Sequence, residues 1–182
     1  MTKLEERDAI LDLVAWKGDE VVLDVGCGRG LMMVGAARRL TTGRAVGVDI
    51  WSERDQSDNL EIAAITNAQI EGVIDLVSVQ TADMRQLPFA DHSFDVIVSN
   101  WVVHNVEPQE ERAKALSEMM RVLRPNGTIL LADIVNRQEY LTEFSRLGMS
   151  NTRLVVRSVW RDWFCRTVSF GAFQPATIVA HK

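Results

Sequence analysis

The sequence predicts a doubly wound α/β fold, in which helices cover both faces of a mostly parallel, seven-stranded sheet with an antiparallel strand at its edge. Strand-like and helix-like segments alternate along most of the chain. The first, second, fourth and fifth strand-like segments are almost entirely apolar, as expected for parallel strands buried on both faces. The last two strand-like segments have no obvious helix between them, which indicates a hairpin and hence one antiparallel strand.

Local signals set the bounds of the predicted elements. Thr2 and Glu5 have the spacing of a capping box at the start of the first helix, and Pro108 suits the first turn of a later helix. Residues 125–127, with the sequence PNG, are typical of a turn. The predicted helices cover residues 3–16, 31–40, 60–71, 108–124 and 138–147, and the predicted strands cover residues 20–25, 44–49, 75–80, 93–99, 128–134, 152–159 and 175–180.

Composition predicts one domain and excludes several kinds of partner. The chain has 182 residues, of which 47% are hydrophobic, enough for one core. The net charge of -5 disfavours general binding to nucleic acid, and no apolar run reaches the roughly 18 residues of a membrane span. Cys27 and Cys165 form no CxxC pair and the histidines do not cluster, so no metal site is expected and reduced thiols in the cytoplasm fit best.

A glycine-rich segment follows the first predicted strand. Residues 21–30, VVLDVGCGRG, join an apolar run to an acid and three glycines. A dinucleotide fingerprint requires GxGxxG, but Leu31 stands where its third glycine would be, and the phosphate-loop pattern GxxxxGK[ST] is absent. Because open α/β sheets bind ligands at the carboxyl ends of their strands, these glycines lie where a ligand is expected.

Five segments in this order resemble the class I S-adenosylmethionine-dependent methyltransferases, a family with a Rossmann-like fold. They are LDVGCGRG, GVD, TADMRQLPF, FDVIVSNWVVHNV and RVLRPNGTILLADI, at or beside the five successive strands. The resemblance extends from Val21 to the C-terminus. It implies a single domain over residues 1–182, with an N-terminal helix in 1–18, a cofactor-binding core in 19–135 and an acceptor-side part in 136–182.

The resemblance implies S-adenosylmethionine as cofactor and S-adenosylhomocysteine as its product. The family pattern assigns the ribose hydroxyls to Asp49 and the adenine amino group to Asp83, although each aspartate could also be an ordinary turn residue. Glycine lets the backbone approach the cofactor where a Cβ would clash. The expected cofactor-binding residues are Asp24, Gly26, Cys27, Gly28, Gly30, Asp49, Ile50, Asp83, Met84 and Asn100.

The expected acceptor-side residues follow the fourth predicted strand. His104 is the candidate general base because histidine titrates near neutrality, and its alternative is a surface or capping role. Trp101 is the second candidate catalytic residue, as a wall that favours the sulfonium by a cation–π contact, and its alternative is the core. The stretch SNWV lacks the (N/D)PPY sequence of the DNA- and glutamine-methylating branches, so those acceptors are disfavoured.

The predicted function is therefore methyl transfer to a small organic acceptor by in-line displacement. The alternative is an S-adenosylmethionine-binding protein that is catalytically silent or works only with a partner, and a homodimer or a lid-completing partner fits either function. The polar loop of residues 51–59 is a candidate lid over the adenosine or a solvated loop. The basic, aromatic stretch of residues 153–166 is a candidate surface for an acidic or aromatic acceptor, a lipid surface or a partner, or else a solvated edge strand and loop whose tryptophans fill the core.

Overall fold

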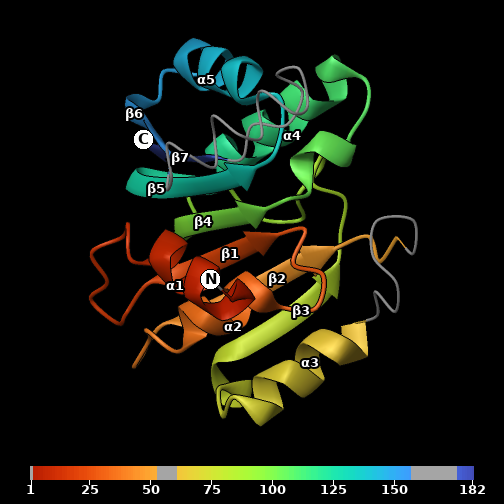
Figure 1. Cartoon of the computed structure of the whole chain (residues 1–182), viewed down its shortest axis with the longest axis vertical. Coiled ribbons are helices and arrows are strands. Elements are labelled where there is room, and N and C mark those ends of the chain that lie inside the picture. Colours follow the sequence, from red (N-terminus) through yellow and green to blue (C-terminus); the bar gives the residue numbers. More distant parts are fainter. Residues whose placement is uncertain (1, 53–60, 157–175) are drawn as a thin grey trace.

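A seven-stranded sheet forms the centre of the molecule. The structure, a computed structural model, describes residues 2–52, 61–156 and 176–182. The strands lie in the order β3-β2-β1-β4-β5-β7-β6 (Figure 1). Strand β7 is antiparallel to β5 and β6, whereas the other neighbouring strands are parallel. The strands are β1 (Val21–Val25), β2 (Arg44–Asp49), β3 (Val77–Thr81), β4 (Phe94–Asn100), β5 (Leu123–Asp133), β6 (Ser150–Val155) and β7 (Ala176–His181).

Helices cover both faces of this sheet. Residues of α1, α2 and α3 share one buried cluster with the sheet, and residues of α4 and α5 share the other. The helices are α1 (Lys3–Leu11), α2 (Leu31–Ala37), α3 (Glu61–Ile70), α4 (Gln109–Val122) and α5 (Arg137–Arg146), with short 3-10 turns η1 (Ile74–Leu76) and η2 (Val103–Asn105). The predicted doubly wound α/β fold is confirmed, with the antiparallel strand one place in from the edge and β6 outermost.

Strand β1 contributes to both buried clusters. Leu23 packs in the cluster with α4 and α5, and Val22 packs in the cluster with α1 to α3. Because side chains alternate along a strand, Asp24 follows Val22 onto the face that α2 covers. Its carboxylate accepts a hydrogen bond from the backbone N–H of Met33 in α2, at 2.8 Å. The acid before the glycines is thus placed inside the molecule by the pleat of the strand.

Helix α1 is shorter than predicted. The spacing of apolar residues predicts a helix over residues 3–16, but α1 ends at Leu11. The indole N–H of Trp16 donates to the carbonyl of Leu11 at 2.8 Å. This side chain therefore occupies a carbonyl that would accept a backbone N–H if the helix continued. The expected N-terminal helical part, residues 1–18, accordingly contains one short helix followed by an irregular segment.

The end of α2 and the start of β3 also differ from the predicted bounds. Helix α2 ends at Ala37 rather than at residue 40, because the N–H groups of Arg39 and Leu40 donate to carbonyls three residues back, as in a 3-10 turn. The predicted strand of residues 75–80 begins at Val77, since η1 takes its first residues.

Strand β5 runs through the predicted PNG turn. The turn signal ends α4 at Val122 instead of residue 124, but residues 125–127 lie inside β5 as a bulge. Between Phe94 and Val96 of β4, the partner on β5 moves from Leu123 to Thr128, so β5 holds extra residues there. The predicted strand of residues 128–134 therefore begins five residues early and ends at residue 133.

Parts of two segments that the sequence analysis singled out lie outside the described residues. The polar loop of residues 51–59 is described only for its first two residues, and the basic, aromatic stretch only as far as residue 156. The predicted strand of residues 152–159 is described as β6 up to Val155. Within residues 2–52, 61–156 and 176–182, no helix has the length and apolar character needed to cross a membrane, and no cluster of acidic, histidine and cysteine side chains could hold a metal ion.

Candidate active site

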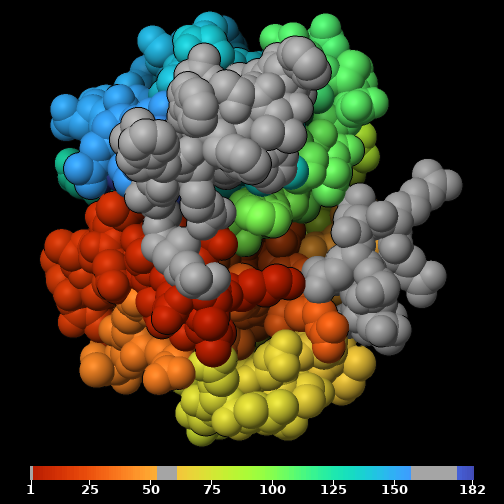
Figure 2. All heavy atoms as spheres, viewed as in Figure 1, coloured from red at the N-terminus to blue at the C-terminus, as the bar shows by residue number. Residues whose placement is uncertain are grey.

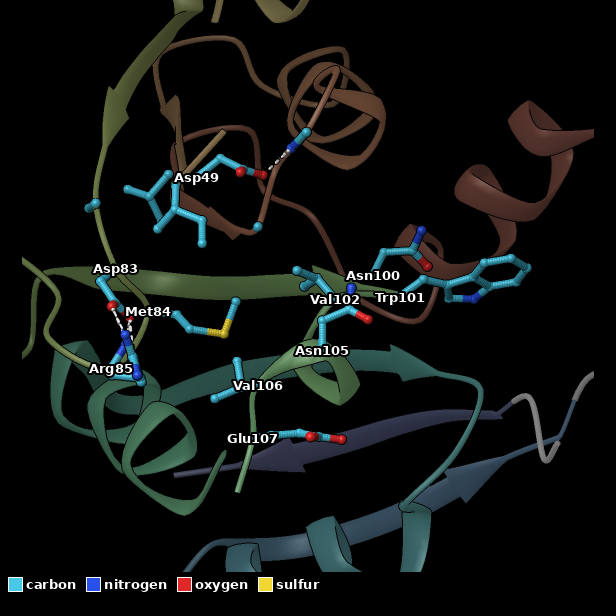
Figure 3. A pocket seen from close by; sticks show the side chains of 15 residues that line it. Asp49, Asp83, Met84, Arg85, Asn100, Trp101, Val102, Asn105, Val106 and Glu107 are labelled. Atoms are coloured by element: carbon cyan, nitrogen blue, oxygen red, sulfur yellow. Dashed lines mark hydrogen bonds and ion pairs between the residues drawn. The ribbon is translucent and has the colours of Figure 1, made fainter. Parts of the chain in front are cut away.

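A cavity of about 270 Å³ lies at the carboxyl ends of the parallel strands (Figure 3). The glycine loop after β1, the end of β2, the residues after β3 and the end of β4 form its wall. Met84 points into the middle of the cavity in Figure 3, and Trp101 lies on the side opposite Asp83. The expected site residues that line it are Gly26, Gly28, Asp49, Ile50, Asp83, Met84, Asn100 and Trp101.

A larger groove of about 630 Å³ adjoins this cavity. Both hollows are lined by the glycine loop and the end of β4, and the groove continues between α1 and α3. Figure 2 shows the surface hollowed between the red N-terminal residues and the green residues that follow β4. The remaining expected cofactor residues, Asp24, Cys27 and Gly30, line the groove. The glycine loop therefore divides one continuous cleft into a smaller and a larger chamber.

Backbone hydrogen bonds fix the glycine loop onto β2. The N–H groups of Gly26 and Cys27 donate to the carbonyl of Val48 at 2.8 and 3.0 Å. Gly26 has a φ of 72°, and a Cβ on it would lie 2.5 Å from a methyl carbon of Val102. Only glycine combines this backbone with this contact. Val102 was not identified from the sequence, because no sequence pattern links it to the glycine loop.

Cys27 is a buried structural residue of the loop. Burial raises the pKa of the Cys27 thiol, with the charges of Asp24 and Asp49 acting in the same direction. The thiol therefore stays protonated, which argues against a nucleophilic role.

Asp49 links the glycine loop to the residues that follow β2. Its carboxylate, almost completely buried, accepts from the N–H of Gly28 at 2.8 Å and from the N–H of Trp51 at 2.7 Å. Trp51 has a positive φ of 57°, an uncommon conformation for a bulky residue. The strand-end acid therefore shapes both rims of the cavity, and each of its oxygens can accept more than one hydrogen bond.

Asp83 is paired with Arg85 at the rim. The guanidinium Nε of Arg85 lies 3.0 Å from both carboxylate oxygens of Asp83. This hydrogen bonding holds the pKa of Asp83 below its ordinary value, against the opposing effect of partial burial. Asp83 is therefore an ionised acceptor beside the cavity, and Arg85 is a site residue that sequence reasoning missed.

Asp24 has the opposite electrostatic environment. Burial is the main cause that raises its pKa to about 7, and the charge of Asp49 adds to it, while the hydrogen bond from Met33 opposes it. Asp24 thus titrates near neutral pH on the wall of the larger groove. Asp83 at the smaller chamber is therefore ionised at neutral pH, whereas Asp24 at the larger chamber gains or loses a proton there.

Asp24 is expected to make the protein less stable as pH rises. Its folded pKa lies above the unfolded value, so the folded state binds the extra proton and the stabilisation, complete below pH about 4, is lost as pH rises through about 7. The loss is at most roughly 4 kcal/mol. Urea unfolding between pH 4 and 8 should show a weaker fall for Asp24→Asn. Asp83→Asn serves as the control, because the pKa of Asp83 is shifted in the opposite direction. If stability fell equally with pH in the wild type and in Asp24→Asn, the assignment to Asp24 would be contradicted.

Trp101 is held in an uncommon backbone conformation at the end of β4. It has a φ of 56°, and its N–H donates to the carbonyl of Ala132 at 2.8 Å. Its side chain is 45% exposed and lines both chambers, so it is not a core residue. Strained residues are common at functional sites.

His104 lies beside the cleft but in neither described lining. Its Nδ1 is 2.6 Å from a carboxylate oxygen of Asp133, and its backbone N–H donates to the other oxygen at 3.1 Å. Asp133 is buried at the end of β5. Sequence reasoning missed this partner, although Asp133 ends an apolar strand in the same way that Asp49 ends β2.

The fold and the cleft together define a class of protein. A glycine loop follows the first strand of an open, doubly wound sheet, and carboxylates lie after the next two strands. Such an arrangement is typical of α/β proteins that bind a nucleoside-containing ligand at the carboxyl ends of their strands.

Comparison with known proteins identifies the family. Residues 23–131 match a family model described as a methyltransferase domain. The uncharacterized methyltransferase Rv0089 of Mycobacterium tuberculosis is 31% identical over 149 residues, which are 79% of this chain and 68% of Rv0089. Methyltransferase GfsG of Streptomyces halstedii is 38% identical over 116 residues, 64% of this chain. The chain belongs to the class I S-adenosylmethionine-dependent methyltransferases.

Solved structures show the same fold. The geranyl diphosphate C-methyltransferase of Streptomyces coelicolor A3(2), in complex with Mg2+, geranyl diphosphate and S-adenosyl-L-homocysteine, matches with a TM-score of 0.76 at 19% identity, over 97% of this chain and 78% of that one. The [4+2]-cyclase SpnF matches with the same TM-score at 18% identity, over 98% and 80%. The match spans only 38% of the length of GfsG and 41% of the demethylmenaquinone methyltransferase of Symbiobacterium thermophilum.

Proposed function

We propose that this chain transfers the methyl group of S-adenosylmethionine to a small organic acceptor by in-line displacement. The observation that carries the proposal is the cleft on both sides of the glycine loop, with Asp49 and Asp83 lining the smaller chamber and Asp24 lining the larger one. The sulfonium of the bound cofactor supplies an already activated methyl group. The protein then has to bind, align and exclude water.

The smaller chamber suits the adenosine half of the cofactor. Asp49 lines this chamber, and a carboxylate oxygen can accept more than one hydrogen bond, so it suits the two ribose hydroxyls. Asp83 is ionised and can accept from the adenine amino group. Met84 and Ile50 line the same chamber and offer apolar cover for the ring.

The larger chamber suits the methionine half. Gly26 and Gly28 bring bare backbone to the boundary between the chambers, and Asp24 lies beyond them. An ammonium group next to Asp24 would favour its ionised form. Asn100 and Trp101 line both chambers, and this supports a position for them beside the sulfonium.

The class of acceptor and the cellular compartment are inferred from the size of the chambers and from the composition of the chain. The larger chamber is of the size of a small-ligand cleft, and the net charge of -5 disfavours general binding to nucleic acid. We place the protein in the cytoplasm because its two cysteines suggest no disulfide framework and fit a reducing compartment. A homodimer or a partner that completes the lid is retained as a proposal on the strength of the open groove.

Titration calorimetry with S-adenosylhomocysteine and with NAD tests the cofactor assignment. We expect saturable binding of S-adenosylhomocysteine and none of NAD. Absence of S-adenosylhomocysteine binding would refute the proposal. A screen of small acceptors with methyl-labelled S-adenosylmethionine then separates the enzyme from a silent binding protein, because only the enzyme transfers the label.

A further inference from the structure

We infer that Arg85 makes the smaller chamber selective for adenine over a 6-oxo purine, because it holds the Asp83 carboxylate in one orientation; the inference rests on the proposed function. The observation behind it is the contact of the Arg85 guanidinium with both oxygens of Asp83 on the wall of that chamber. Figure 3 shows the two side chains facing each other at the end of the chamber away from Trp101. Both residues belong to the short segment that follows β3.

Residues 83–86 form a tight turn that brings these two side chains together. The backbone N–H of Gln86 donates to the carbonyl of Asp83 at 3.0 Å, which closes the turn. The backbone N–H of Arg85 donates to the Asp83 side chain at 2.8 Å, and this is the contact by which an aspartate stabilises a turn. The first and third residues of the turn therefore meet, while Met84 between them points into the chamber.

The Arg85 guanidinium fixes the orientation of the carboxylate. Its Nε lies 3.0 Å from both oxygens of Asp83, and its Nη2 donates to Oδ2 at 2.5 Å. Because the planar fork of the guanidinium matches a planar carboxylate, this contact sets the tilt of the carboxylate as well as its position. Nη1 of Arg85 donates to Glu111 in the first turn of α4 at 3.3 Å, and this second contact holds the arginine in place.

The Asp83 carboxylate still has room for a ligand donor. Its two oxygens offer about four acceptor positions, and the N–H groups of Arg85 occupy only part of them. The Asp83 side chain is 37% exposed, so a ligand in the chamber can reach it. Within residues 2–52, 61–156 and 176–182, Arg85 supplies every hydrogen bond to this carboxylate. Arg85 therefore determines where the remaining acceptor positions point.

A fixed carboxylate distinguishes two purines of the same shape. Adenine carries an amino donor on C6, whereas a 6-oxo purine carries an oxygen there and has its N–H on the neighbouring N1. A carboxylate that is free to move would follow the donor from one purine to the other, and both would bind. A carboxylate held by Arg85 accepts from the amino group and repels the 6-oxo oxygen. The selectivity therefore depends on the restraint by Arg85 in addition to the charge of Asp83.

Titration calorimetry with S-adenosylhomocysteine and with its 6-oxo analogue, S-inosylhomocysteine, tests this inference. We expect the wild type to prefer S-adenosylhomocysteine by about 10-fold or more. Arg85→Met keeps a long side chain without its donors and should reduce this preference about threefold or more. Arg85→Lys should reduce it as well, because an ammonium keeps the charge but lacks the fork. Arg146→Met is the control: it removes an exposed arginine, paired with Glu143 outside both chambers, and should leave the preference unchanged.

A double variant shows whether Arg85 acts through Asp83. Asp83→Asn should abolish the preference, because its amide can donate to a 6-oxo group as well as accept from an amino group. Arg85→Met added to Asp83→Asn should then cause no further change in the preference. A further change would mean that the arginine contacts the purine itself, which would overturn the positioning role. Circular dichroism establishes that each variant is folded before it is titrated.

The other outcomes separate the inference from the proposed function. An unchanged preference in Arg85→Met, or the full preference in Arg85→Lys, would overturn the inference. Tighter binding of S-adenosylhomocysteine by Arg85→Met would overturn it too, since the arginine would then compete with adenine for the carboxylate. Equal binding of both ligands by the wild type would refute the assignment of Asp83 to the adenine amino group and the inference with it. A wild type that binds neither ligand would refute the proposed function instead.

Discussion

Gly26→Ala is expected to destabilise the protein far more than Gly72→Ala, although both glycines have a φ of +72°. A left-handed backbone costs an alanine about 1–2 kcal/mol at either position. At Gly72 nothing lies within 4 Å of the added Cβ, whereas at Gly26 the two methyl carbons of Val102 lie 2.5 and 2.6 Å away. Overpacking of this kind adds about 1–3 kcal/mol. The difference in stability between the two variants therefore measures the contact of the glycine loop with Val102, which follows β4.

Urea unfolding and calorimetry with S-adenosylhomocysteine measure this difference. Gly26→Ala should lose both stability and binding, because the displaced loop separates the two chambers. Gly72→Ala should keep its binding, since Gly72 lies after α3 and outside both linings. Val102→Ala added to Gly26→Ala should recover part of both losses. Equal losses of stability at the two glycines would show that the loop does not pack as described.

Asp49→Ala is expected to weaken S-adenosylhomocysteine binding by roughly 100-fold, or about 3 kcal/mol. The variant loses the proposed partner of the ribose hydroxyls. It also releases the N–H groups of Gly28 and Trp51, which the carboxylate holds at 2.8 and 2.7 Å. Asp49→Asn should be impaired as well, because its amide group turns a donor toward one of these two N–H groups.

The controls for Asp49 separate binding from folding. Asp91→Ala removes an exposed carboxylate that pairs with Arg121, and it should leave the affinity unchanged. Circular dichroism and urea unfolding at 25 °C establish that Asp49→Ala is folded under the conditions of the calorimetry. An unchanged affinity in folded Asp49→Ala would refute the ribose assignment.

The succession of helices and strands along the chain, and the burial of the central strands on both faces, were predictable because they depend on apolar patterning. Strand β1 reads as continuous apolar residues up to Asp24, and this identifies a strand buried on both faces. The end of α1 was not predictable, because the indole of Trp16 returns to cap Leu11. Nor was the continuation of β5 through residues 125–127, because a turn signal and a bulge share the same residues and only the pairing with β4 distinguishes them.

The candidate site divides in the same way. Residues at strand ends, such as Asp49, were predictable because parallel strands bring their carboxyl ends to one edge. The contact of His104 with Asp133 joins residues 29 apart in the chain, and depends on β4 and β5 being adjacent. Once β4 and β5 are assumed to be neighbours, Asp133 at the end of β5 is the expected partner of His104. Comparing the residues at the ends of neighbouring strands would therefore have identified this contact.

The position of β7 determines the order in which the sheet can assemble. Strand β6 precedes β7 in the chain but meets the sheet only through it, since β7 lies between β5 and β6. Without β7, β6 would therefore have no partner strand and the edge of β5 would stay open. An open edge of this kind recruits strands from other chains. A chain truncated before β7 is therefore expected to aggregate more readily than the full chain.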